Sequence, residues 1–288
     1  MQTLQILKRQ IDLSVQLLGV VKTTKTMAAV AWHQFGNALA SLEHYEEAVS
    51  LGLGALLGHQ EEKQEARDTG PAAVIAFGPD HGLCGRFTDD VALATHAWMG
   101  RQNRETLLAV VGARLAERLE DMGHPRREVL FSAPSSVPMV GVLAQEILLF
   151  LDALRQKKPS GIGLIYARHQ ERLGLSIEEV SLIPVHLRPP ARPAPSTRSL
   201  PLFPASRQAL LSTFISERIV IELFRAVANS AAAEAFSRLS AMQAAETHLD
   251  EHIADLDQKY RASRQEKITG ELLEIVSGFE AILARKKP

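Results

Sequence analysis

The chain has 288 residues, a formal net charge of −1 and 46% hydrophobic residues. This length allows one large domain or two modest ones, and the neutral balance excludes an electrostatic footprint for nucleic acid over the chain as a whole. The single cysteine, Cys84, excludes an internal disulfide and indicates a reducing compartment. No run of about 18 uncharged apolar residues occurs, and the N-terminus lacks a signal-peptide core, so we expect neither a membrane span nor secretion.

Residues 1–58 are predicted to form a long N-terminal helix. The segment contains no proline. Its apolar residues recur at helical spacing, at Leu4, Leu7, Ile11, Val15, Leu18 and Val21 or Lys22. The stretch that carries Gly52, Gly54 and Gly58 would end the helix. The charged segment 59–70 is interpreted as a solvated linker.

Between residues 71 and 186, short apolar runs alternate with helical stretches. The predicted strands are Ala72–Phe77, Leu107–Val111, Val129–Phe131, Gly163–Ala167 and Glu179–Val185. The predicted helices are Arg86–Met99, Ala113–Met122 and Gly141–Gln156. Strands that read as continuous apolar runs and alternate with helices favour a Rossmann-like α/β domain with a largely parallel sheet.

A proline-rich segment and a second long helix complete the chain. Seven prolines lie between Pro184 and Pro204, which predicts an extended connector over residues 187–204. Residues 205–288 are predicted to form one helix of roughly 120 Å. Its apolar residues recur at three- and four-residue steps, at Ala235, Leu239, Met242, Ala245, Leu249, Ile253, Leu256 and Tyr260.

Such a helix is too long to bury its seam against one compact core. We therefore expect the N- and C-terminal helices to pair as an antiparallel coiled coil. The predicted fold class is α/β, with the Rossmann-like domain inserted between the two long helices.

The turn Gly78–Gly85 follows a strand and precedes a helix. In α/β enzymes this position often binds phosphate, because backbone N–H groups and the helix dipole converge there. The segment has neither the P-loop pattern nor the spacing of a dinucleotide-binding turn. We interpret it as a structural turn, with ligand binding as the alternative, and Cys84 as a small buried residue rather than a nucleophile.

The segment His248–His252 (HLDEH) matches the H-x-x-E-H pattern of a class of zinc protease. Two histidines four residues apart share a helix face. These two lie in an extended coiled-coil helix with no evident pocket, so solvated or subunit-facing histidines are the favoured interpretation. We assign no metal ligand and no catalytic residue.

The motifs occur together in the order of a known family. Tyr260–Gly278 (YRASRQEKITGELLEIVSG) is similar to the C-terminal signature of the γ subunit of the F-type ATP synthase, and Arg238–Glu246 (RLSAMQAAE) resembles an earlier part of that helix. The family's SDRGLCG turn is matched at Asp80, Gly82, Leu83, Cys84 and Gly85. At the N-terminus, Leu7–Ile11, Lys22, Lys25 and Met27–Ala29 fit the family's basic first helix.

Three departures from the family indicate a divergent branch. Leu13–Val21 is largely apolar where the family is densely basic, Thr23 and Thr24 stand around a usual methionine, and the proline-rich connector is unusual. Such a branch is expected among the alternative ATPases that some bacteria carry beside a housekeeping enzyme.

The resemblance implies a non-catalytic rotor of the central stalk in a proton- or sodium-translocating F-type ATP synthase. The rotor couples ion flow through the membrane ring to ATP synthesis or hydrolysis. The implied partners are the α and β subunits, the ε subunit and the c-ring, at the cytoplasmic face of the bacterial inner membrane. ATP, ADP and Mg would bind to partner subunits, and this chain would hold no cofactor.

By the same resemblance, a set of polar side chains is expected to contact the ring of α and β subunits: Lys22, Lys25, Arg238, Arg264, Gln265, Thr269 and Glu271. A solvated helix face is the alternative for the lysines. Two further functions are considered for the whole chain, an α/β enzyme that oligomerises through a coiled coil and a coiled-coil scaffold. The enzyme would bind its ligand at the Asp80–Cys84 turn, but the sequence pairs no nucleophile with a plausible base.

Overall fold

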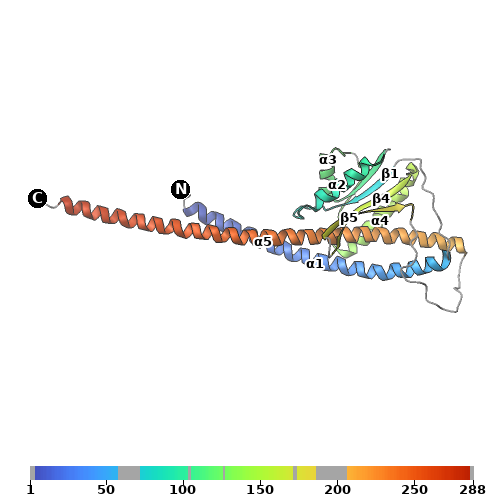
Figure 1. Ribbon diagram of the computed structural model, residues 1–288, viewed down its shortest axis with the longest axis horizontal. Helices are drawn as coiled ribbons and strands as arrows, with labels where there is room; N and C mark the ends of the chain where they lie inside the picture. Colours follow the sequence, from blue (N-terminus) through green and yellow to red (C-terminus); the bar gives the residue numbers. More distant parts are fainter. Residues whose placement is uncertain are drawn as a thin grey trace. The chain divides into compact units, whose positions relative to one another are not determined.

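The computed structural model describes residues 4–57, 72–102, 105–125, 127–170, 174–185 and 206–285 (Figure 1). The chain divides into two compact units, one of residues 1–26 and 241–288 and one of residues 27–240. Two long helices, α1 (Leu4–Leu57) and α5 (Arg207–Arg285), contribute to both units. The linker and the connector expected at 59–70 and 187–204 lie outside the described residues, so those boundaries stay predictions.

The larger unit contains a five-stranded sheet in the order β3-β2-β1-β4-β5. Its strands are β1 (Ala72–Phe77), β2 (Thr106–Val111), β3 (Val129–Phe131), β4 (Gly161–Gln170) and β5 (Gly174–Ile183). Three of the four neighbouring pairs are parallel, and β5 is antiparallel to β4. The short connection between β4 and β5 explains this exception, because a parallel pair needs a crossover of a dozen or more residues.

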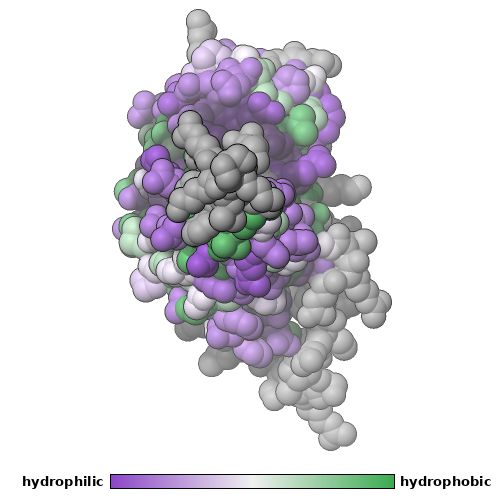
Figure 2. Space-filling model, turned by 90° about the vertical axis from the view of Figure 1, so that its left-hand side faces the viewer, coloured by the Kyte–Doolittle hydropathy of each residue, from purple (hydrophilic) through white to green (hydrophobic). Residues whose placement is uncertain are grey.

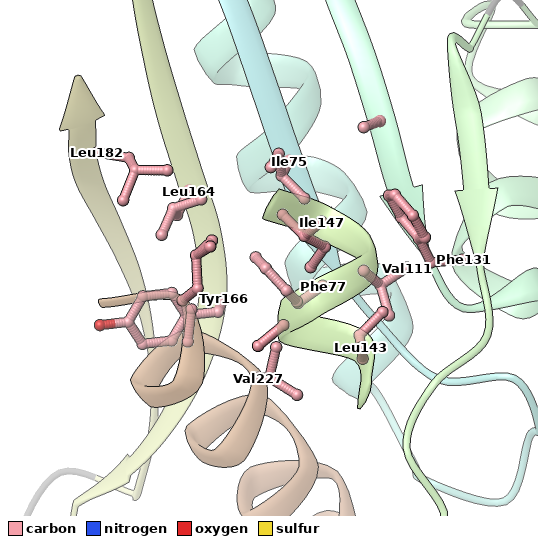
Figure 3. Close-up of a cluster of buried hydrophobic side chains, with 14 of the residues drawn as sticks. Ile75, Phe77, Val111, Phe131, Leu143, Ile147, Leu164, Tyr166, Leu182 and Val227 are labelled. Atoms are coloured by element: carbon pink, nitrogen blue, oxygen red, sulfur yellow. The ribbon is translucent and has the colours of Figure 1, made fainter. Parts of the chain in front are cut away.

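Helices cover both faces of this sheet. On one face lie α2 (Phe87–Gly100) and α3 (Ala113–Asp121), and on the other lie α4 (Val137–Leu154) and parts of α1 and α5 (Figures 1 and 3). Every residue of β1 is buried. Its side chains alternate between the two hydrophobic clusters, with Ile75 and Phe77 on the α4 side and Val74 and Ala76 on the α2 side. Burial on both faces is why this strand is a continuous apolar run in the sequence.

The predicted bounds differ most from the structure at β4 and β5. β4 extends beyond the predicted strand Gly163–Ala167 at both ends. β5 begins five residues before the predicted Glu179 and ends at Ile183 rather than at Val185. In the added part, Arg168 lies opposite Ser176 and Gln170 lies opposite Gly174. These polar residues belong to the outer end of a hairpin, where cross-strand pairing rather than core packing fixes the conformation.

The apolar helix α4, with the 3-10 turn η1 (Arg155–Lys157) after it, has a mean hydropathy of 1.8 and is long enough to cross a membrane. It contains no long uncharged run, because Glu146 and Asp152 interrupt the apolar sequence. A core helix passes the same test, and the inner face of α4 packs in the sheet cluster through Leu143 and Ile147 (Figure 3). We therefore describe α4 as a core helix of the α/β domain.

In each unit, a stretch of α1 lies beside a stretch of α5 (Figure 1). In the larger unit Trp32 of α1 contacts Phe236 of α5, with ring centroids 5.3 Å apart. In the smaller unit the seam predicted for α1 is wrong at one position. Val15 is 51% exposed, whereas Ser14 is 7% exposed. The buried residues follow a strict alternation of four- and three-residue steps, and that repeat reaches Ser14 rather than Val15.

Candidate functional site

The turn after β1 connects three strand ends through one carboxylate. Asp80 accepts hydrogen bonds at 2.9 Å from the backbone N–H of Ala113, at the start of α3, and from that of Ala133, which follows β3. A carboxylate that lies beside the first residue of a helix, as Asp80 does, also interacts favourably with the helix dipole. Asp80 therefore holds the chain after β2 and the chain after β3 against the end of β1.

Two backbone features explain the glycine-rich sequence around this turn. Leu83 and Gly85 adopt positive φ values of 66° and 57°, and Gly112, after β2, has a φ of 95°. A Cβ atom on Gly112 would lie 2.4 Å from the carbonyl oxygen of Gly78. Only glycine permits this approach between the segments that leave β1 and β2.

Helix α5 contacts the same turn through Arg238, which donates to Glu234 at 2.6 Å and lies 3.5 Å from the carbonyl oxygens of His81 and Gly82. Burial raises the pKa of Glu234, and the charge of Arg238 opposes that rise. About two helical turns before Arg238, the Ser230 hydroxyl donates to the carbonyl oxygen of Phe77 at 3.1 Å. Arg238 was expected to contact a partner subunit, and the structure engages it within the chain.

A cavity of about 490 Å³ lies beside the turn, between the starts of α2 and α3. Both arginines on its wall already pair with carboxylates at 2.7 Å, Arg114 with Glu117 and Arg118 with Asp89. Cys84 is buried, and burial raises the pKa of its thiol, which disfavours the reactive thiolate. These contacts fit a structural turn better than a phosphate or nucleophile site.

The two lysines expected to contact the ring lie on α1, next to Glu246 of α5 in the smaller unit. Lys25 donates a hydrogen bond to Glu246, and the Lys22 Nζ lies 3.9 Å from the same carboxylate. The Lys22 side chain is 52% exposed and that of Lys25 is 31% exposed. Lys25 thus joins the two helices, while more of the Lys22 side chain is accessible to a partner.

The C-terminal part of α5 extends beyond the first described residue of α1, Leu4. With Lys22 opposite Glu246 in an antiparallel pair, Leu4 falls opposite about residue 264. The side chains from Arg264 to Gly278 are all exposed. Four of the predicted contact residues lie at or beyond this point: Arg264, Gln265, Thr269 and Glu271.

Along this single helix, polar and apolar side chains are interspersed. The Thr269 hydroxyl donates to the carbonyl oxygen of Gln265 at 2.9 Å, and Lys267 lies 3.8 Å from Glu271. Large apolar side chains about half exposed occur among these polar residues, at Ile268, and directly after them, at Leu272, Leu273, Ile275 and Val276. A helix with this much uncovered apolar surface needs a protein partner.

The histidine motif on α5 lies in solvent. The His248 side chain is 81% exposed, and the carboxylate of Glu251 lies 3.8 Å from its Nδ1. Within the ranges that the structure describes, no group of three or more His, Cys, Asp and Glu side chains is placed to hold a metal ion. The zinc-protease pattern therefore has no geometric support there.

Sequence reasoning missed a charged network in the larger unit. Arg218 and Arg225 of α5 both donate to Glu46 of α1 and to Glu222 of α5. Burial tends to raise the pKa of Glu46, but the hydrogen bond from Arg218 and the charges of both arginines hold it below its usual value. The available signal was the spacing of residues 218, 222 and 225, which puts three charges on the face of α5 that meets α1.

A family model described as ATP synthase matches residues 3–282, nearly the whole chain. The chain belongs to the ATP synthase gamma family. The gamma chain of Geotalea daltonii is 26% identical over 297 residues, covering 98% of this chain and 99% of the relative. That of Paramagnetospirillum magneticum is 26% identical over 300 residues, covering 94% of this chain and 98% of the relative.

A chain in the Euglena gracilis mitochondrial ATP synthase, in a structure of its OSCP, F1 and c-ring, has the same fold. Its TM-score is 0.68 at 14% identity, with coverage of 99% of this chain and 96% of that chain. A chain in the rotor structure of the same enzyme gives a TM-score of 0.63 at 12% identity, covering 92% and 98%. Family and fold together make this chain a central-stalk subunit of an ATP synthase, which is part of a membrane-associated ATPase complex. The α/β enzyme alternative is not favoured.

Proposed function

We propose that this chain is the non-catalytic rotor of its complex and that nucleotide chemistry takes place only on partner subunits. The strongest support for this proposal comes from the C-terminal part of α5, from Arg264 to Gly278. Its side chains there are all exposed, although several are large and apolar. A surrounding ring of α and β subunits would cover this helix on all sides, which a partner on one face could not do.

The polar residues on this end suit a shaft that rotates. A continuous apolar interface would hold the helix in one orientation, whereas a few exposed polar contacts are weak and readily exchanged. We assign the ring contacts first to Arg264, Gln265, Thr269 and Glu271, and then to Lys22. Lys25 and Arg238, which already bond within the chain, act mainly on the structure of the shaft.

Torque transmission requires that the two helices of the shaft turn together. In the larger unit, the network of Arg218, Arg225, Glu46 and Glu222 joins α1 to α5 with charge-assisted hydrogen bonds. In the smaller unit, Lys25 and Glu246 do the same. These bonds support a two-helix shaft that resists twisting better than one helix.

The α/β domain would supply the off-axis surface that holds the ε subunit and the c-ring, at the cytoplasmic face of the bacterial inner membrane. The hydrogen bonds from Ser230 and Arg238 of α5 to the end of β1 and its turn support this assignment, because they connect the domain to α5. A domain fixed to the shaft in this way moves with the shaft when the membrane ring turns.

Reconstitution with the α and β subunits of the same source tests the proposal. We expect a stable complex with one copy of this chain per ring and ATP hydrolysis that depends on it. The double variant Ile268→Gln, Leu272→Gln should assemble poorly, because it removes apolar surface from the end of α5. The matched control, Leu93→Gln, changes a similarly exposed residue of α2 and should assemble normally. A chain that forms only its own oligomers and leaves hydrolysis unchanged would overturn the proposal.

A further inference from the structure

In the smaller unit, α1 has two apolar seams rather than one. The buried seam faces α5 and includes Leu7, Ile11, Ser14, Leu18 and Val21. The second seam consists of Ile6, Leu13, Leu17 and Val20, which are 47%, 57%, 48% and 61% exposed. Each member of the second seam directly precedes a member of the buried one, so the second seam lies about 100° around the helix.

The spacing of the second seam is that of a helix-packing surface. Ile6, Leu13 and Val20 are seven residues apart, and Leu17 lies between the last two at steps of four and three. Apolar residues in this pattern form the stripe that a second helix needs to pack side chains between turns. Isolated exposed apolar residues need no explanation, but a regular stripe indicates a partner.

We propose that this second seam binds an amphipathic helix of another subunit in the same complex, so that α1 contacts that helix and α5 on two neighbouring faces. The inference rests on the proposed function, because it takes the partner from the assembled ATP synthase. It assigns a binding face to the Leu13–Val21 stretch, which the sequence left without a role.

The charges around the seam define the chemistry of the partner. No charged residue occurs from Leu13 to Val21. The outer border of the seam is formed by the residues three positions after Ile6, Leu13 and Val20, namely Arg9, Gln16 and Thr23. The complementary helix therefore presents an uncharged apolar stripe, with a carboxylate only near the end that meets Arg9.

A second copy of this chain and a lipid surface fit the second seam less well. Four side chains about half exposed offer on the order of a few hundred Å², whereas a stable dimer buries about 800 Å² per partner, which argues against a second copy. A lipid surface would meet a largely hydrophilic protein, because α5 in this unit exposes charged residues such as Asp250, Glu251 and Asp255. Figure 2 likewise shows only small hydrophobic patches on a mainly hydrophilic face.

Substitution tests the seam against a matched neighbour. The double variant Leu13→Gln, Val20→Gln removes two members of the seam, and Val15→Gln removes a valine of similar exposure on the opposite flank of α1. We expect the double variant to bind reconstituted α, β and ε subunits about tenfold more weakly, with unchanged helicity by circular dichroism. Val15→Gln should bind like the unaltered chain. Equal affinities for the two variants would overturn the inference.

A photo-reactive residue at position 17 identifies the occupant in the reconstituted complex. We expect adducts to one helical segment with apolar residues at three- and four-residue steps. An adduct between two copies of this 31.6 kDa chain, an adduct to lipid, or reaction with solvent alone would each overturn the inference. Failure of the unaltered chain to assemble would instead contradict the proposed function, so the two failures are distinguishable.

Discussion

Arg218 of α5 donates a hydrogen bond to Glu46 of α1 at 2.5 Å, although the two residues are 172 positions apart in the chain. The Arg218 side chain is only 5% exposed. Burial of a guanidinium is tolerated only where carboxylates surround it, and Glu222 supplies the second one. The pairing therefore favours one register between the two helices, because a shift by one turn would leave Arg218 buried without a partner on α1.

Removal of the α1 carboxylate should destabilise the larger unit. We expect Glu46→Ala to lower the free energy of unfolding by about 3–5 kcal/mol, because it leaves buried arginine charge partly uncompensated. Urea unfolding followed by circular dichroism measures the loss. Glu43→Ala, an exposed glutamate one turn earlier in α1, is the control and should change stability little. Equal losses for the two variants would show that the register does not depend on Glu46.

The same carboxylate should make stability depend on pH in the acid range. The folded-state pKa of Glu46 lies below its ordinary value of 4.5, since the arginines outweigh the effect of burial. A lowered folded-state pKa means that the stabilisation is fully present above about pH 4.5 and is lost as the pH falls below that value.

Thermal unfolding between about pH 7 and pH 3.5 tests this dependence. We expect the melting temperature of the unaltered chain to fall more steeply at the acid end than that of Glu46→Gln, which cannot titrate at this position. Glu234, whose pKa burial raises, contributes with the opposite sign, but it is present in both proteins and cancels in the comparison. Parallel curves would contradict the assignment.

Hydrophobic periodicity was sufficient to predict the two long helices and the buried strands, because it reports directly which side of an element is covered. It placed Val15 in the seam and missed Ser14, since a buried serine has no apolar signal. It also missed the Arg218 network. Charged residues at seam positions are normally predicted to face solvent, and their partners on α1 are far away in the sequence.

Prediction of the candidate contacts depended on resemblance rather than on physics. The sequence motif placed Arg264 and Gln265 on the C-terminal helix, but only the structure shows that the described part of α1 begins opposite these residues. Arg238 belongs to the same family signature, and its bonds to the β1 turn could not be foreseen, because the carbonyl groups it meets are more than 150 positions away.

Asp80 should be more important for stability than an average surface carboxylate. Asp80→Ala leaves the N–H groups of Ala113 and Ala133 without their acceptor, at a cost of about 2–4 kcal/mol in the free energy of unfolding. Asp80→Asn keeps one acceptor oxygen and should lose about half as much. Asp121→Ala, an exposed carboxylate at the end of α3, is the control. An unchanged free energy of unfolding in Asp80→Ala would contradict the view that this side chain joins the strand ends.

Two glycine substitutions should have opposite effects. Gly112→Ala introduces a Cβ atom 2.4 Å from the Gly78 carbonyl oxygen at a residue with positive φ, so we expect a loss of about 3 kcal/mol or more. Gly19→Ala lies within α1, where no atom is near the added Cβ, and should stabilise the helix by about 0.5–1 kcal/mol. Differential scanning calorimetry of both variants measures the two shifts, and the same sign for both would contradict the backbone argument.

The end of α5 provides the sharpest test of the ring contacts. Arg264→Ala and Gln265→Ala remove exposed polar groups from the helix beyond α1, so each should leave the fold of the free chain intact. In the reconstituted complex we expect ATP turnover to fall about fivefold, which corresponds to roughly 1 kcal/mol of lost interaction. Arg261→Ala, an exposed arginine one turn earlier that lies 3.2 Å from Asp257 on its own helix, should leave turnover unchanged. Comparable turnover in all three variants would mean that the ring contacts α5 elsewhere, with Thr269 and Glu271 as the next residues to substitute.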